Sequence, residues 1–295
     1  MSFSSAADGQ ATALQGVHSR LPSGRLNRAW RIGATGLCFT LFGVGGVLLA
    51  LTVFPVLRCI SWTADSMRRR IQYAMHQVFC LFVWIMKSLG LLSYEIHGRE
   101  RLLAPGSLII ANHPSLIDVV FLISLVPQVD CIVKEGLWRN PFLRWPVVWA
   151  RYIANRDPRR LVADCVAALQ AGRSLIVFPE GTRSVPGRLM AMKRGAAQIA
   201  LLAGAPIVPV TILCDPPTLT KAESWYHVPL RRPHWTLFVG EPFKAADVIP
   251  QGQPQPVAAR HLTQHFLDYF SSQTGMRSAT VAAGGTTAAS TAAVA

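Results

Sequence analysis

The chain has 295 residues, of which 51% are apolar and 15% are charged, so we expect one catalytic domain with further segments, part of them in lipid. Lys and Arg outnumber Asp and Glu by 29 to 15, which predicts an anionic partner: nucleic acid, a membrane surface or a phosphorylated substrate. The six cysteines are scattered, without a C-x-x-C pair or a Cys/His cluster, which argues against a zinc site and a disulfide framework and predicts reduced thiols.

The N-terminal part predicts a tail and then a membrane helix. Residues 1–31 are rich in Ser, Ala and Gly and are expected to form a disordered tail that ends in a basic flank. Residues 32–57 run for 26 positions without a charge, until Arg58. A spanning helix needs about 20 apolar residues, whereas the apolar core of a signal peptide has about 7–15. The run therefore predicts a membrane helix, and its length disfavours a buried core helix.

A second apolar segment covers residues 71–92, after three consecutive arginines at 68–70. It carries Gln72, His76, Gln77 and Lys87 among its apolar residues. Two interpretations stay open: a second span that completes a hairpin, or a helix in the membrane interface with the arginines on lipid phosphates. Basic residues flank the first helix on both sides, so the positive-inside rule gives no orientation. Residues 32–92 are thus assigned to the membrane.

Residues 93–250 change to an α/β pattern. Short apolar runs alternate with helical stretches, as in a mixed, mostly parallel sheet that helices cover on both faces. The predicted strands are 108–111, 130–134, 152–154, 175–178, 207–213 and 235–239. One helix begins at Asp157-Pro158 and ends at Gly172, and another runs from about Gly195 to residue 202. Residues 251–274 predict a linker and a helix, and residues 275–295 a disordered tail.

The first motif follows the strand at 108–111. It reads Ala-Asn-His-Pro-Ser-Leu-Ile-Asp, with His113 and Asp118 at a strand-to-helix turn, where open α/β sheets place their chemistry. An imidazole near pH 7 can accept a proton, and a carboxylate can fix its tautomer, so the pair could deprotonate a hydroxyl. Alternatively, Ser115 and Asp118 form a helix capping box.

The second motif, Phe-Pro-Glu-Gly-Thr-Arg-Ser at 178–184, follows the strand at 175–178. Gly181 would let the backbone approach a ligand, while Thr182 and Arg183 offer donors to phosphate oxygens. The alternative is a tight turn with a surface salt bridge between Glu180 and Arg183. Arg156 and the Lys193-Arg194-Gly195 segment also fall at strand or helix ends, where an anion would be favoured.

Together, the motifs at 112–118 and 178–184 resemble the first and third motifs of the glycerolipid acyltransferases of the 1-acylglycerol-3-phosphate type. The segment Pro-Ile-Val-Pro-Val at 206–210 resembles the fourth, and residues 152–156 the second, where Ala150 replaces an expected glycine. The resemblance covers roughly residues 94–240 and implies the glycerolipid acyltransferase fold.

The resemblance also implies a reaction. A fatty acyl group would move from acyl-CoA or acyl-carrier protein to the hydroxyl of a lysophospholipid, foremost 1-acylglycerol 3-phosphate, in phospholipid biosynthesis. His113 would be the general base and Asp118 its partner, without a covalent intermediate on Ser115. Lys134 would help to hold the oxyanion. The acceptor phosphate site would comprise Arg156, Glu180, Gly181, Thr182 and Arg183.

No metal or cofactor is implied beyond the acyl-thioester co-substrate. The expected partners are the lysophospholipid, the acyl donor and membrane lipid, and the expected location is the bacterial inner membrane, with the catalytic domain at its cytoplasmic face. A different acceptor, such as a lyso-ornithine lipid, is the first alternative, and Ala150 together with the excursion at 216–233 leaves room for it. The other alternative is a non-catalytic membrane-binding protein. Nucleic-acid binding is disfavoured, because many basic residues flank apolar helices.

Overall fold

The computed structural model describes residues 25–185, 189–221 and 223–275. Within them lies a seven-stranded sheet with the order β1-β7-β6-β2-β5-β3-β4. All neighbouring strands are parallel except β6 and β7, which are antiparallel. The strands are β1 (Ser93–His97), β2 (Leu108–Ala111), β3 (Asp130–Lys134), β4 (Ile153–Asn155), β5 (Leu175–Val177), β6 (Ile207–Asp215) and β7 (His234–Val239). The mixed, mostly parallel sheet expected from the sequence is confirmed.

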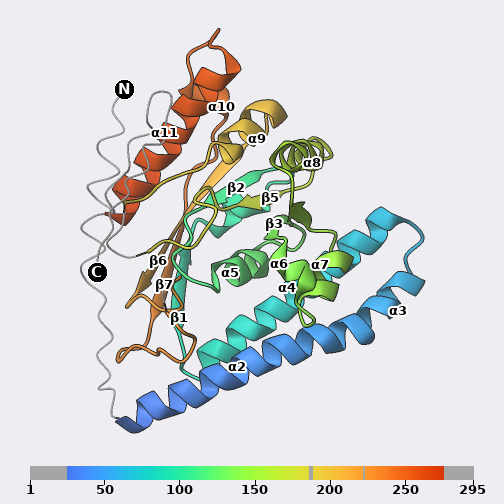
Figure 1. The fold of residues 1–295 in the computed structure, drawn as a ribbon, viewed down its shortest axis with the longest axis vertical. Helices are drawn as coiled ribbons and strands as arrows, with labels where there is room; N and C mark the ends of the chain where they lie inside the picture. The colour runs from blue at the N-terminus through green and yellow to red at the C-terminus, as the bar shows by residue number, and fades with distance from the viewer. Residues whose placement is uncertain (1–24, 186–188, 222, 276–295) are drawn as a thin grey trace, which may run out of the picture.

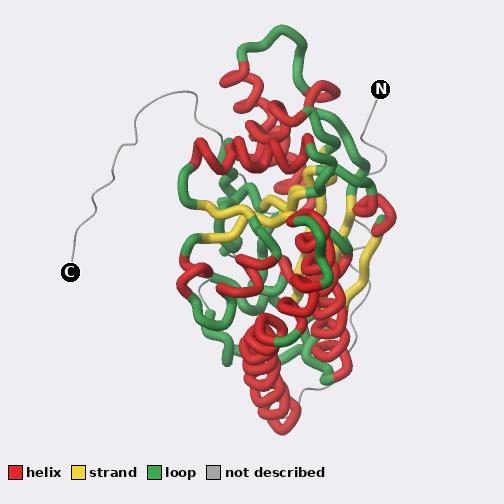
Figure 2. The backbone as a smooth tube through the Cα atoms, turned by 90° about the vertical axis from the view of Figure 1, so that its right-hand side faces the viewer, coloured by secondary structure: helices red, strands yellow, loops and turns green. Residues whose placement is uncertain are grey.

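Helices cover both faces of the sheet, as Figures 1 and 2 show. They are α2 (Arg25–Leu51), α3 (Val53–Cys59), α4 (Ala64–Ser88), the 3-10 helix η1 (Arg99–Leu103), α5 (Asp118–Leu125), α6 (Gly136–Arg139), α7 (Arg144–Trp149), α8 (Pro158–Gln170), α9 (Gly195–Ala203), α10 (Ala245–Val248) and α11 (Gln255–Thr274). One core joins α2, α4, α5 and α7 to the sheet, and the other joins α8, α9 and α11 to it.

Strand β2 shows how the sequence builds these two cores. Successive side chains of a strand point to opposite faces, and all residues of β2 are buried. Leu108 and Ile110 therefore pack in the core with α8 and α9, while Ile109 and Ala111 pack in the core with α4 and α5. Because both faces are covered, the strand reads as a continuous apolar run, which is why its position could be predicted.

The first apolar run of the sequence forms two helices. Helix α2 begins at Arg25, so the disordered tail predicted for residues 1–31 is wrong for residues 25–31, while residues 1–24 lie outside the described residues. The helix stops at Leu51 and α3 starts at Val53, since Pro55 has no N–H to continue the ladder. In the described part of the chain, Leu26–Cys59 is the one stretch long and apolar enough to cross a membrane. The predicted C-terminal tail is likewise not described beyond residue 275.

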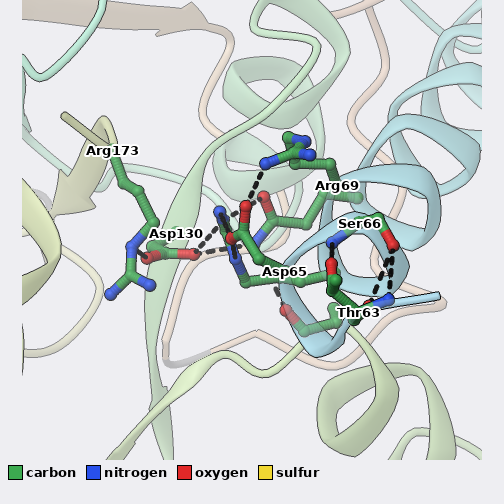
Figure 3. A network of polar contacts seen from close by, with 9 residues as sticks. Thr63, Asp65, Ser66, Arg69, Asp130 and Arg173 are labelled. Atoms are coloured by element: carbon green, nitrogen blue, oxygen red, sulfur yellow. Dashed lines mark hydrogen bonds and ion pairs between the residues drawn. The ribbon is translucent and has the colours of Figure 1, made fainter. Parts of the chain in front are cut away.

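Helix α4 packs against the α/β domain, with α5 as its neighbour. Its buried face includes Gln72 and His76, two of the polar residues that had left its location open in the sequence, whereas Gln77 and Lys87 are exposed. Gln72 donates to Asp130 Oδ1 over 2.7 Å and to the Ala150 carbonyl over 3.2 Å. Arg68 and Arg173 lie 3.6 and 3.0 Å from the two oxygens of Asp130 (Figure 3). Of the two interpretations left open for this segment, the one that places the arginine run on lipid phosphates is therefore wrong for Arg68, whose guanidinium is buried in this network.

Candidate active site

The loop after β2 is fixed by the side chain of Asn112. Its Nδ2 donates to the Ile212 carbonyl over 2.8 Å, and its Oδ1 accepts from the Ile212 N–H over 2.7 Å. Strand β6 continues to Asp215, whereas β2 ends at Ala111. Where the β2 backbone turns away, the side-chain amide of Asn112 therefore forms the hydrogen bonds to β6 that the next backbone residue of β2 would have formed. This contact holds the following residue, His113, at the carboxyl end of the sheet.

His113 and Asp118 form the predicted pair. His113 Nδ1 lies 2.9 Å from Asp118 Oδ2, which also accepts from the Ser115 N–H over 2.6 Å. The other oxygen, Oδ1, accepts from Trp235 Nε1 over 3.3 Å. Asp118 is fully buried, which raises its pKa, while these hydrogen bonds favour the charged form. The bond from the Ser115 N–H is one half of the expected capping box, but α5 begins at Asp118 with Ile117 as its N-cap, and Ser115 Oγ has no hydrogen-bond partner among the described residues, so the capping-box prediction is wrong.

The second motif holds the backbone of His113 from the other side. Glu180 Oε1 accepts from the His113 N–H over 3.0 Å and from Ser184 Oγ over 2.8 Å. The Ser184 N–H in turn donates to the His113 carbonyl over 2.7 Å. Phe178 stacks on the imidazole with ring centroids 4.2 Å apart. Glu180 is buried, which raises its pKa, and its carboxylate thus positions the histidine loop rather than meeting a phosphate.

His113 lines a cavity of about 710 Å³. Its wall includes Phe39 and Phe42 of α2, Phe79 and Phe82 of α4, and Val120 of α5, so one part is apolar and is closed by the helices of the N-terminal segment. Four cationic side chains also line it. These are Lys134, Arg183, Lys193 and Lys221. The site therefore combines an imidazole–carboxylate pair, an apolar chamber and positive charge.

Most of the predicted phosphate-binding residues line this cavity. Gly181, Thr182 and Arg183 do so, and Arg183 Nη1 donates to the carbonyls of Leu219 and Thr220 over 2.8 and 3.0 Å. Lys134, the predicted oxyanion residue, lies in the wall at the end of β3. Arg156 does not line the cavity: it is exposed after edge strand β4, with its Cζ 5.2 Å from the centre of the Trp138 ring. Glu180 is also outside the lining.

Lys193 also belongs to the site, although the phosphate-binding residues predicted from the motifs did not include it. Gly181 has a φ of +67°, and a Cβ there would lie 2.9 Å from Lys193 Nζ. The ammonium group thus lies over the glycine of the second motif, in the space that only a residue without a side chain leaves free. Its position before α9 was visible in the sequence, but its contact with residue 181 was not. Among the described residues, no group of three or more His, Cys, Asp or Glu side chains is arranged to hold a metal.

Comparison with known proteins agrees with this geometry. The family model named Acyltransferase matches residues 93–213, which hold both motifs, His113 and Asp118. Residues 93–213 of this chain are therefore similar to the acyltransferase family. A chloroplast 1-acyl-sn-glycerol-3-phosphate acyltransferase of Brassica napus is 30% identical to this chain over 190 residues, which cover 60% of this chain and 53% of the relative. The enzyme of the same name from Pseudomonas aeruginosa is 28% identical over 141 residues, 45% of this chain and 55% of the relative.

These alignments span about half the length of the two relatives. A similar fold is seen in the crystal structure of the 1-acyl-sn-glycerophosphate acyltransferase PlsC from Thermotoga maritima. That structure aligns with a TM-score of 0.57 and 17% identity, over 83% of this chain and 97% of the other chain. At this identity the likeness concerns the fold alone.

Proposed function

We propose that this protein is an acyltransferase that transfers a fatty acyl group from an acyl thioester to the free hydroxyl of a lysophospholipid, foremost 1-acylglycerol 3-phosphate, which gives phosphatidate. The observation that carries the proposal is the His113–Asp118 pair in the wall of an apolar cavity that also holds Lys134, Arg183 and Lys193. An acyl chain fits the apolar chamber, and the cations suit a phosphate beside the reacting hydroxyl.

The proposed reaction needs one base and no covalent enzyme intermediate. With its Nδ1–H donated to Asp118, His113 keeps the lone pair of Nε2 for the acceptor hydroxyl. As the hydroxyl loses its proton to Nε2, its oxygen attacks the thioester carbonyl; the C–O bond forms, the C–S bond breaks, and the imidazolium returns the proton to the departing thiolate. Ser115 is fully buried and its N–H is committed to Asp118, which suits a structural role better than a nucleophilic one.

The proposed acceptor site lies between the two motifs. The hydroxyl and the phosphate of 1-acylglycerol 3-phosphate are only about 5 Å apart, so the phosphate must lie close to His113. Thr182, Arg183 and Lys193 line the cavity there, with Gly181 leaving room for the lysine. Lys134 stays the predicted donor to the oxyanion. A role of Arg156 in this site, as the second motif predicts, would require its guanidinium to leave Trp138.

A lipid substrate also fits the N-terminal helices. The stretch Leu26–Cys59 could enter a membrane, and Phe39 and Phe42 within it line the cavity. An acceptor could therefore pass from the bilayer into the site without crossing water. We propose that the catalytic domain lies at the membrane surface, on the cytoplasmic face of a bacterial inner membrane.

The test is an acylation assay with membranes that contain the protein, 1-acylglycerol 3-phosphate and a long-chain acyl thioester. We expect phosphatidate to form, and we expect His113→Ala to lower the rate by about 10²–10⁴-fold, the usual contribution of a general base. A His113→Ala variant that keeps the parent rate would contradict the mechanism. A parallel panel with lyso-ornithine lipid and monoacylglycerol decides the acceptor class, because faster use of a phosphate-free acceptor would reject lysophosphatidate as the substrate.

A further inference from the structure

We propose a second anion site, at the edge strand β4, that binds the phosphates of coenzyme A in the acyl donor. The site consists of Arg139 at the end of α6 and of Arg159 and Arg160 in the first turn of α8, and we call these residues the β4-edge arginines. The inference rests on the proposed acyl transfer from a thioester. It adds a location and a ligand for the half of the donor that does not react.

The β4-edge arginines have no partners within the described parts of the chain. All three side chains are exposed, and none forms an ion pair with a carboxylate or donates a side-chain hydrogen bond. The nearby Asp157 instead caps α8, since its carboxylate accepts from the Arg159 N–H over 3.0 Å. Three unpaired guanidinium groups on adjoining elements offer planar forks of donors, the geometry that suits phosphate oxygens.

The elements that carry these arginines adjoin each other. Arg156 follows β4 and lies over Trp138, the residue before Arg139, so α6 and the end of β4 are in contact. Arg159 and Arg160 come within one turn after Arg156 in the chain. The three arginines therefore flank the carboxyl end of β4 from both sides, and the Trp138 ring between them adds an aromatic surface.

The catalytic cavity extends to the same edge. Its lining includes Lys134 at the end of β3, Asn155 at the end of β4, and Leu161 and Val162 of α8. Val162 lies three residues after Arg159, on the same side of the helix. The cavity that contains His113 thus continues under the first turn of α8, and a molecule that leaves it there would meet the β4-edge arginines.

The dimensions agree with a phosphopantetheine donor. In the sheet order, β2 is separated from β4 by β5 and β3, which makes three strand spacings, or about 14 Å, from the strand of His113 to the edge. The arm between the thioester sulfur and the first phosphate has about thirteen bonds and extends to roughly 16 Å. With the thioester at His113 and the arm along Lys134 and Asn155, the phosphates would reach the β4-edge arginines.

Coenzyme A fits this surface better than a lipid surface or a carrier protein. Its three phosphate groups are compact, like the arginine group, and its adenine could stack on Trp138 or on an arginine. Helices α2 and α4 contribute Phe39, Phe42, Phe79 and Phe82 to the cavity wall, so lipid contacts are expected at that apolar wall instead. A carrier protein would present carboxylates over a broader area than these three residues cover.

The experiment compares two donors that share the thioester arm: an acyl-CoA and the matching S-acyl pantetheine, which lacks the three phosphates and the adenosine. In the double variant R159Q/R160Q, we expect the KM for acyl-CoA to rise by about 10-fold or more with kcat unchanged, since charge-assisted bonds to phosphate are lost. The KM for acyl pantetheine should stay within about twofold. The matched control R99Q/K244Q removes two exposed cations on η1 and before α10, and both KM values should stay at the parent level.

The outcomes separate this inference from the proposed function. If the parent protein acylates no lysolipid with either donor, the proposed function is wrong. If the parent is active and R159Q/R160Q leaves the KM for acyl-CoA unchanged, the second anion site is wrong. With acyl-carrier protein added as a third donor, a rise in its KM alone would also overturn the second anion site, in favour of a protein donor. If the double variant loses activity with both donors, Arg159→Lys is measured instead, because it keeps the charge and removes only the planar fork of donors. A rise in the KM for acyl-CoA relative to the KM for acyl pantetheine would support the second anion site, and an unchanged ratio would contradict it.

Discussion

Replacing Asp118 by Asn tests the catalytic pair, because Asn has the same shape but one acceptor oxygen where the carboxylate has two. If that oxygen faces His113 and Ser115, the amide NH₂ faces the indole N–H of Trp235, so two hydrogen-bond donors meet without an acceptor. If the side chain is flipped, the NH₂ faces Nδ1 of His113 and forces the proton to Nε2, so that the base has no lone pair for the substrate. Both arrangements weaken the base.

The expected loss follows from the role of the base. General-base catalysis contributes about 10²–10⁴-fold, so kcat/KM of D118N should fall by up to that factor, or about 2.7–5.4 kcal/mol in activation free energy. The free energy of unfolding should change by less than about 2 kcal/mol, because lost hydrogen bonds to the charge are offset by relief from burying it. Burial raises the pKa of Asp118, which shows that the charged form is disfavoured there.

Initial rates and thermal unfolding in one detergent–lipid mixture measure both quantities. Ser115→Ala is the matched control, since it keeps the backbone N–H to Asp118 and removes a buried hydroxyl that has no hydrogen-bond partner among the described residues. It should retain the rate within about threefold, as expected for a residue outside the chemistry. A D118N variant that retains parent activity, or an S115A variant without activity, would refute the reasoning.

Three further predictions concern the framework. Burial raises the pKa of Glu180, so the folded protein keeps the proton on this carboxyl to higher pH than the unfolded chain does. The contribution of Glu180 to stability therefore falls as the pH rises from the ordinary Glu range through the folded-state pKa. The melting temperature of E180Q relative to the parent should increase with pH, and a difference that stays constant with pH would contradict this. Arg151 has a φ of 56°, so Arg151→Gly should raise the free energy of unfolding by about 0.5–1 kcal/mol in denaturant titration, whereas a loss would show that its side chain contributes more than the strain. Asn112→Ala leaves the buried N–H and carbonyl of Ile212 unpaired and should lower the free energy of unfolding by about 2–4 kcal/mol in the same assay, with a smaller loss indicating that the loop rearranges.

The site was predictable where its contacts are local. His113 and Asp118 are five residues apart across one turn, and α5 starts at Asp118, so the sequence places both side chains together. The same holds for the strands, whose apolar runs match a sheet that is buried on both faces. Strand β1 was not predicted, because it is an edge strand with half-buried and exposed residues and has no continuous apolar run.

Contacts between distant segments could not be predicted. Glu180 resembles a ligand-binding residue in its motif, but its partner is the backbone of residue 113, 67 positions earlier. Arg68 resembles a lipid-binding residue next to two other arginines, but its partner Asp130 belongs to β3. In both cases the sequence shows a charge, and only the fold shows which group is opposite it.

The wall that α2 contributes to the cavity has a practical consequence for the biochemist. Removing residues 1–59 to obtain a water-soluble fragment would also remove Phe39 and Phe42, and the apolar chamber would open to bulk water. Such a fragment could keep its sheet and its histidine loop and still be a poor guide to chain-length preference. Purification should therefore retain the N-terminal helices and supply detergent or nanodiscs, since the compartment for the fatty tail is built jointly by both parts of the polypeptide.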